Sequence, residues 1–206
     1  MKLRFYTGTS SASVPGRLQL KRTRFAAYAC KSYLHFVYVL LCTWVPWPLR
    51  RFFPGGYRIK WQWIRETFLV SCACPAAVFN TENRLVATFT DLDNSGGNAP
   101  FPVIKISSDH LFYINGWPLP PGTRLAAVSS YHRHDTSVPD PDGEFLYRWE
   151  SFTPMIVETM FWDAESQGDI HERIPEDEWR ALEEGLAQIP PDAGEGLYPI
   201  ILSDQQ

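Results

Sequence analysis

Short stretches of apolar and aromatic residues recur along the chain after residue 56, and turn-forming residues separate them. The first, residues 57–63, places Tyr, Ile and Trp at every second position with polar side chains between them, and this alternation predicts a strand. Its aromatic face would point inward and its basic edge would face the solvent. Further strands are predicted at residues 68–73, 76–79, 85–90, 102–106, 110–114, 123–131, 145–149 and 155–159.

The pattern changes to a helical period near the C-terminus. Pro175 is followed by three acidic residues, which the positive end of a helix dipole favours in the first turn. An apolar stripe at helical spacing comes next, and Pro190 stops it. We predict one helix here, packed on the strands through the stripe, and a last extended piece at residues 194–202. The stripe consists of Trp179, Leu182, Leu186 and Ile189.

These elements predict a mainly β, α+β fold. Many short strands with regular turns are typical of an antiparallel β-barrel or sandwich. Strands do not alternate with helices in the way that a parallel, doubly wound sheet requires. The predicted architecture is an antiparallel β-barrel or sandwich that is closed by one C-terminal helix and preceded by an apolar N-terminal helix.

Residues 25–53 are apolar over a longer stretch than any predicted strand. A helix needs about 20 apolar residues to cross a bilayer core; here Lys31 and His35 interrupt the stretch, and Pro46 and Pro48 fall near its end. Tyr and Trp residues flank its centre and basic residues lie outside both ends, as at membrane interfaces. Three interpretations stay open: a membrane helix that spans or lies in the interface, a buried helix of a soluble protein, and a targeting leader.

The chain carries its charges unevenly. Residues 1–65 hold twelve Lys or Arg and no Asp or Glu, whereas residues 66–206 hold the other seven cations and all 23 acids. We therefore divide the chain into a basic flexible leader (1–24), an apolar helical segment (25–53) and an acidic β-rich domain (56–206). An acid-free arm of this length is typical of a segment that meets an anionic surface, such as phospholipid head groups or nucleic acid.

The predicted partners follow from this division of charge. The arm is predicted to bind an anionic lipid surface, and the acidic domain to meet an unidentified protein partner. Nucleic acid is disfavoured because the acidic domain would repel phosphate, although residues 57–63 interleave basic and aromatic side chains. We expect a membrane-associated protein with its acidic domain in the cytoplasm; the alternative is a soluble cytoplasmic protein.

The four cysteines form no pattern that predicts a disulfide framework or a zinc site. Cys72 and Cys74 would share one strand face, where closing a disulfide over so short a loop strains the chain. A structural zinc would need two further ligands, and no second cysteine pair lies nearby. We predict buried thiols in a reducing compartment, and no cofactor.

Candidate chemistry is sparse. On a strand, His132 and His134 would share a face and could bind a transition metal with a carboxylate, although surface histidines are the favoured interpretation. Three polar residues would be held in position best by the predicted strands, and they could line a pocket that binds an anion or another ligand. They are Asp91, Lys105 and Arg124. No nucleophile elbow, phosphate loop or dinucleotide fingerprint is present. A non-catalytic, membrane-associated interaction module is favoured; the alternative is a metal- or anion-binding small enzyme or ligand-binding barrel.

Seven short sequence pieces of the acidic domain occur in the same order as in a known family. On the basis of these pieces, residues 66–198, approximately, resemble an uncharacterised bacterial protein family that is known only as a domain of unknown function. The resemblance implies a bacterial source and a single compact domain, and it implies no activity or functional residue that could be transferred. The pieces are CPAAV (74–78), TDL (90–92), PVIKI (102–106), PGTRL (121–125), RWESFTP (148–154), IPEDEW (174–179) and G-L-Y (196–198).

Overall fold

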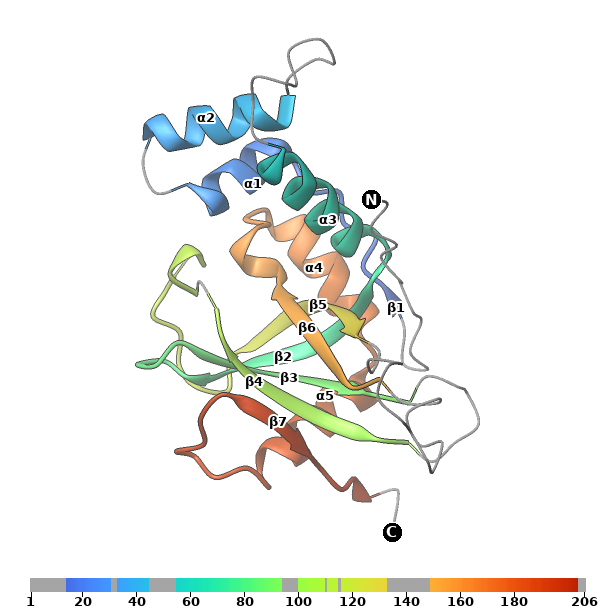
Figure 1. Ribbon diagram of the computed structural model, residues 1–206. Coiled ribbons are helices and arrows are strands. Elements are labelled where there is room, and N and C mark those ends of the chain that lie inside the picture. The colour runs from blue at the N-terminus through green and yellow to red at the C-terminus, as the bar shows by residue number, and fades with distance from the viewer. Residues whose placement is uncertain are drawn as a thin grey trace.

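The centre of the molecule is an antiparallel sheet that curls into a half-barrel (Figure 1). The structure is a computed structural model. Helices cover one face of the sheet, and α2 lies at the end of the molecule farthest from β7 (Figure 1). The described residues are 14–30, 33–44, 55–93, 100–109, 111–114, 116–132 and 149–203.

The sheet has seven strands, all paired antiparallel. Lys105 Nζ of β4 donates a hydrogen bond to the Phe152 carbonyl of β6, so the curl brings these two strands opposite each other. In the described part of the chain β6 and β7 do not pair, so the sheet stays open between them. The predicted mainly β, antiparallel fold is confirmed in this coarse form. The order is β6 (Ser151–Ile156), β5 (Arg124–His132), β2 (Cys72–Asn80), β3 (Leu85–Asp91), β4 (Pro102–Ser108) and β7 (Gly196–Pro199), with β1 (Val14–Pro15) paired to β2.

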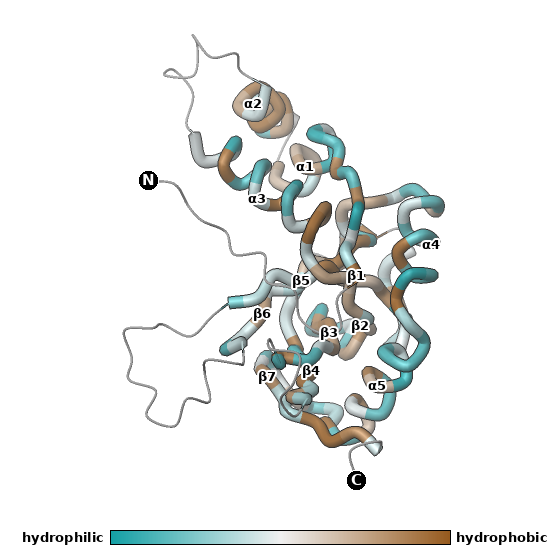
Figure 2. Tube along the Cα trace, turned by 90° about the vertical axis from the view of Figure 1, so that its right-hand side faces the viewer, coloured by the Kyte–Doolittle hydropathy of each residue, from teal (hydrophilic) through white to brown (hydrophobic). Residues whose placement is uncertain are grey.

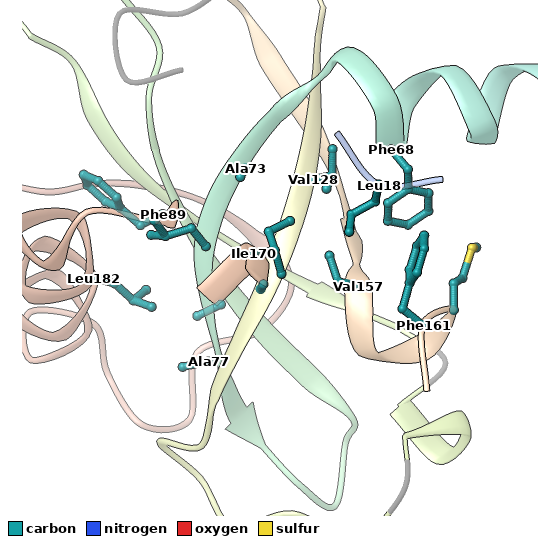
Figure 3. Close-up of a cluster of buried hydrophobic side chains, with 14 of the residues drawn as sticks. Leu18, Phe68, Ala73, Ala77, Phe89, Val128, Val157, Phe161, Ile170 and Leu182 are labelled. Carbon is teal, nitrogen blue, oxygen red and sulfur yellow. The ribbon is translucent and has the colours of Figure 1, made fainter. Parts of the chain in front are cut away.

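Successive residues of β2 serve two different cores. Ala73 and Ala77 point into a core shared with the helices, whereas Cys74 and Ala76 point into the curl of the sheet. Figure 3 shows the helix-side core, with Leu182 among the side chains that meet the sheet. Burial on both faces explains why this strand reads as a continuous run of small and apolar residues.

Two helices follow β6, where the sequence predicted one. α5 (Glu176–Leu186) packs on β2, β3 and β4, and its Trp179 and Leu182 are buried. The preceding helix, α4 (Ala164–Arg173), escaped prediction because Ile170 is its only buried residue and no apolar stripe marks it.

Residues 57–63 form part of a helix, and the strand predicted there is wrong. α3 (Gly56–Val70) buries Trp61, Ile64 and Phe68 at spacings of three and four residues. The ring of Trp61 packs on that of Phe25, with their centroids 5.6 Å apart. The alternation over seven residues concealed the helical period because Ile64 and Phe68, which reveal it, lie beyond that window.

Several other predicted strands differ at their edges or in type. Residues 68–73 divide between the end of α3 and the start of β2. The strand expected at residues 110–114 is replaced by a 3₁₀ turn, η2 (Leu111–Tyr113). Residues 155–159 divide between β6 and a second turn, η4 (Val157–Thr159), because the chain turns there and directs Glu158 at the backbone of β5. Residues 145–148 lie outside the described residues.

The apolar N-terminal segment contains two short helices in place of one long helix. α1 (Arg22–Ala29) ends at Cys30, whose backbone is extended, and α2 (Tyr33–Trp44) follows. Among the residues that the structure describes, no helix is both long enough and apolar enough to cross a membrane.

Residues 14–24 pack against the domain, although the sequence assigned them to a flexible leader. β1 pairs with β2, and the Gly16 N–H donates a hydrogen bond to the Ser71 carbonyl at 2.9 Å. Leu18 and Leu20 are buried and Gln19 between them is exposed, as in an extended segment with one face against a core. The arm is therefore joined to the domain at its base, and α2 projects from that base.

Candidate functional site

Among the described residues, the outward side of α2 is apolar and solvent-exposed. The helix contains no charged residue, and its trace is mostly hydrophobic (Figure 2). Among its described side chains, the five exposed ones are apolar or aromatic. Their spacing of three or four residues aligns them in one stripe. Leu34 is 80% exposed and Trp44 is 71% exposed, so the stripe does not serve the core of the domain. We call Leu34, Val37, Tyr38, Leu41 and Trp44 the α2 apolar face.

Contacts with the rest of the molecule hold α2 in place. Val39 and Cys42 are buried against the rest of the molecule. His35 Nε2 lies 2.7 Å from the hydroxyl of Tyr57 in α3, and the rings of Tyr38 and Tyr57 meet edge to face with centroids 6.0 Å apart. The α2 apolar face is therefore presented by an anchored helix.

A basic rim lies beside this face. Lys21, Arg22 and Thr23, at the start of α1, line a pocket of about 370 Å³ together with Leu40, Leu41 and Trp44 of α2. Cations at a helix N-terminus are disfavoured by the helix dipole, and the first turn of α1 contains no acid to offset them. The free backbone N–H groups at this end of α1, together with the side chains of Lys21 and Arg22, would favour a bound anion. The pocket can thus accept an apolar chain beneath a negatively charged group.

A second hollow, which we call the charged cleft, lies between the arm and α4. Its volume is about 640 Å³, and Lys21 lines both it and the α1–α2 pocket. One set of lining side chains is basic and another is acidic. The cleft contains Arg17, Lys21 and Arg24 from the arm, and Asp163, Glu165 and Asp169 from α4 and its cap.

The three residues predicted to bind an anion do not come together. Lys105 faces the inside of the curl, where burial lowers its pKa and its ammonium donates to a backbone carbonyl. Arg124 lies against α5, where it pairs with Glu176 at 3.0 Å and with Glu183 at 2.8 Å. The hydrogen bonds to these two carboxylates raise the pKa of Arg124. Both ion pairs are solvent-exposed, so they contribute little to the free energy of unfolding.

Asp91 has a local structural role at the end of β3. Its Oδ1 accepts hydrogen bonds from the backbone N–H groups of Asp93 and Phe101, each at 2.8 Å. The carboxylate thereby joins the two sides of the β3–β4 connection. A common site for Asp91, Lys105 and Arg124 is not formed.

The two candidate metal ligands cannot be evaluated as a pair, because His134 lies outside the described residues. His132 stands at the end of β5, with its Nε2 atom 2.8 Å from Thr153 Oγ1. Burial lowers the pKa of His132, and the positive charge of Lys105 lowers it further. Within the described ranges, no group of three or more His, Cys, Asp or Glu residues could hold a metal ion.

Sequence reasoning missed a buried carboxylate in η4. Glu158 is only 5% exposed, and its Oε1 accepts a hydrogen bond from the Ala126 N–H at 2.9 Å and lies 2.7 Å from His171 Nε2. The His171 ring stacks on Trp179 with a centroid distance of 5.5 Å. The cluster joins η4, α4 and α5 to β5. Its members stand in separate segments of the chain, so no local pattern could have indicated it.

The cysteines are free thiols. Cys72 and Cys74 are buried inside the curl, and burial raises the pKa of Cys74 to about 12. A thiol with that pKa is a poor nucleophile at neutral pH. Their arrangement gives them a packing role.

Comparison with known protein families and with curated proteins finds no match, so neither supplies a transferable activity. Among solved structures, the chain is similar to a Corynebacterium diphtheriae protein described as a "putative membrane protein". The two are 18% identical with a TM-score of 0.47, and the match covers 62% of this chain and 99% of the other. A likeness at this level supports no conclusion about function.

Proposed function

We propose that the protein is a non-catalytic module that attaches peripherally to an anionic lipid surface. The α2 apolar face enters the interface, and the basic rim contacts the head groups. The single observation that carries the proposal is an anchored, uncharged helix whose described exposed side chains are all apolar or aromatic and lie beside Lys21 and Arg22.

The dimensions of α2 favour a helix that lies in the interface. Its 12 residues span roughly 18 Å at 1.5 Å per residue, whereas a bilayer core is about 30 Å thick. An amphipathic helix parallel to the surface needs no such length. Of the interpretations open at the outset, the interfacial one therefore has the most support.

The expected affinity follows from the same residues. Transfer of the five exposed side chains contributes about 1 kcal/mol each on average, roughly half of the value for full burial, because about half of their combined surface is exposed. Lys21 and Arg22 add about 1 kcal/mol each near an anionic leaflet. The sum of about 7 kcal/mol corresponds to a dissociation constant on the order of 10 µM, and added salt weakens the ionic part.

Vesicle co-sedimentation tests the proposal. The intact protein is mixed at low and high salt with vesicles that contain phosphatidylglycerol. We expect Leu34→Glu and Trp44→Glu each to lower the affinity by about tenfold or more. Ile201→Glu is the matched control, because Ile201 is 63% exposed and lies just beyond β7, at the other end of the molecule (Figure 1).

Two results would overturn the proposal. One is wild-type protein that stays in the supernatant with every vesicle at low salt. The other is a loss of binding with Ile201→Glu as large as that with Leu34→Glu, because an apolar residue remote from α2 would then matter equally.

A further inference from the structure

The charged cleft contains unused charges of both signs. Asp163 caps α4 by accepting from the Ser166 N–H at 2.9 Å, and Asp169 pairs with Arg173 at 2.8 Å. The Arg24 guanidinium lies 4.1 Å from the centre of the Trp162 ring. In the part of the chain that the structure describes, no ion pair joins Arg17, Lys21 or Glu165 to another residue. Hydrogen bonds from Ser166 and, to a smaller extent, the charge of Lys21 lower the pKa of Asp163. Among the described residues, the cleft thus contains two cations and one carboxylate that form no direct ion pair.

The positions of these charges are set by the backbone. The Arg17 N–H donates a hydrogen bond to the Leu69 carbonyl at 3.0 Å, which fixes the base of the arm against α3. Glu165 stands in the first turn of α4, two residues after the Asp163 cap. The cations and the carboxylate thus belong to two anchored elements on opposite sides of the cleft.

Lys21 connects the charged cleft to the apolar pocket between α1 and α2, because it lines both. The pocket volume of about 370 Å³ equals roughly a dozen groups of the size of a water or a methylene, at about 30 Å³ each. A ligand that fills both hollows needs an apolar chain, an anionic group near Lys21 and a cationic group beyond it.

We propose that the two hollows together bind one phospholipid whose head group carries both a phosphate and a primary ammonium. The phosphate lies at Lys21 and Arg17, the ammonium donates hydrogen bonds to Glu165, and part of an acyl chain lies against Leu40, Leu41 and Trp44. The inference rests on the proposed membrane attachment and adds the class of lipid that is recognised. A primary ammonium fits better than a quaternary one, because only the primary group can donate to the carboxylate. The face of Trp162, which could attract a quaternary ammonium, already carries Arg24.

The test compares two vesicle compositions with the same share of phosphatidylglycerol and either phosphatidylethanolamine or phosphatidylcholine as the remaining lipid. We expect the intact protein to bind the ethanolamine vesicles about fivefold more tightly, the effect of one partly exposed charged contact. Ethanolamine lipids can also loosen head-group packing and so favour any amphipathic helix, and a carboxylate variant separates the two effects.

Glu165→Gln is expected to abolish the preference for ethanolamine and to leave binding to the choline vesicles unchanged. Glu172→Gln is the matched control, because Glu172 is an exposed carboxylate on α4 that does not line the cleft. A preference that persists in Glu165→Gln, or that Glu172→Gln reduces equally, overturns this inference and leaves the proposed attachment intact. Absence of binding to all vesicles overturns the attachment itself.

A final arm distinguishes a lipid from a soluble metabolite with the same head group. Glycerophosphoethanolamine, which lacks acyl chains, is added as a competitor to protein bound to the ethanolamine vesicles. We expect it to compete only weakly, because it leaves the α1–α2 pocket empty. Competition at concentrations comparable to that of the accessible lipid would show that the chain contributes nothing, and would overturn the lipid assignment.

Discussion

Replacing Trp179 by Ala tests the packing of α5 on the sheet. Trp179 is 3% exposed, stacks on His171 and lies beneath the Arg124 guanidinium, whose central carbon is 5.0 Å from the ring centre. A buried tryptophan removes about 200 Å² from water, which at about 25 cal/mol per Å² corresponds to about 5 kcal/mol. Residual burial in the unfolded chain reduces this by about 10–40%. We therefore expect a loss of about 3–5 kcal/mol in the free energy of unfolding, as for other buried aromatics.

The measurement is urea unfolding followed by far-ultraviolet circular dichroism, since removal of a tryptophan would change a fluorescence signal directly. Trp162→Ala is the control, because Trp162 is 45% exposed and its main contact is Arg24. That change is expected to cost about 1 kcal/mol. If Trp179→Ala costs no more than Trp162→Ala, the docking of α5 through its apolar stripe is refuted.

Two further predictions concern carboxyl groups, one buried and one half-buried. Glu158→Ala leaves the Ala126 N–H buried without its acceptor, so we expect a loss of about 1–3 kcal/mol in urea unfolding; a change within error would mean that Glu158 does not join η4 to β5. Burial raises the pKa of Glu178 from 4.5 to about 8, so the folded protein retains a proton that the unfolded chain releases. The stabilising contribution is complete below pH 4.5 and is lost as the pH rises through 8. Glu178→Gln should therefore flatten the fall in thermal stability over that range, and parallel wild-type and variant curves would contradict the shift.

The candidate site was only partly predictable from the sequence. The run of basic residues and the apolar stretch both pointed to an anionic lipid surface, because residue type alone reveals them. The α2 apolar face could not be distinguished from a buried stripe, because the sequence pattern would be the same if another helix covered these residues. Likewise, Lys21 and Glu165 are far apart in the chain, and only folding places them along one cleft.

Asp91, Lys105 and Arg124 show what strand position leaves undecided. Lys105 and Arg124 occupy strands where the sequence expected them, and Asp91 ends β3 one residue beyond the predicted strand at residues 85–90. Their neighbours then decide their roles: a chain connection for Asp91, the inside of the curl for Lys105, and the acids of α5 for Arg124. Strand position indicates which face a side chain takes, but the curl and the helices determine which groups it meets.

The chain by itself determined those elements whose pattern is complete within a short window. These include β3, β4, β5 and α5, where alternation or a stripe reflects burial on one or both faces. It also determined the unequal division of charge, which depends on no contact. Tertiary structure alone decided that residues 57–63 are helical, because Trp61 gains its partner Phe25 only in the folded arm. The helix α4 and the exposed side of α2 were decided in the same way, since local periodicity records that a face is apolar but long-range packing determines what covers it.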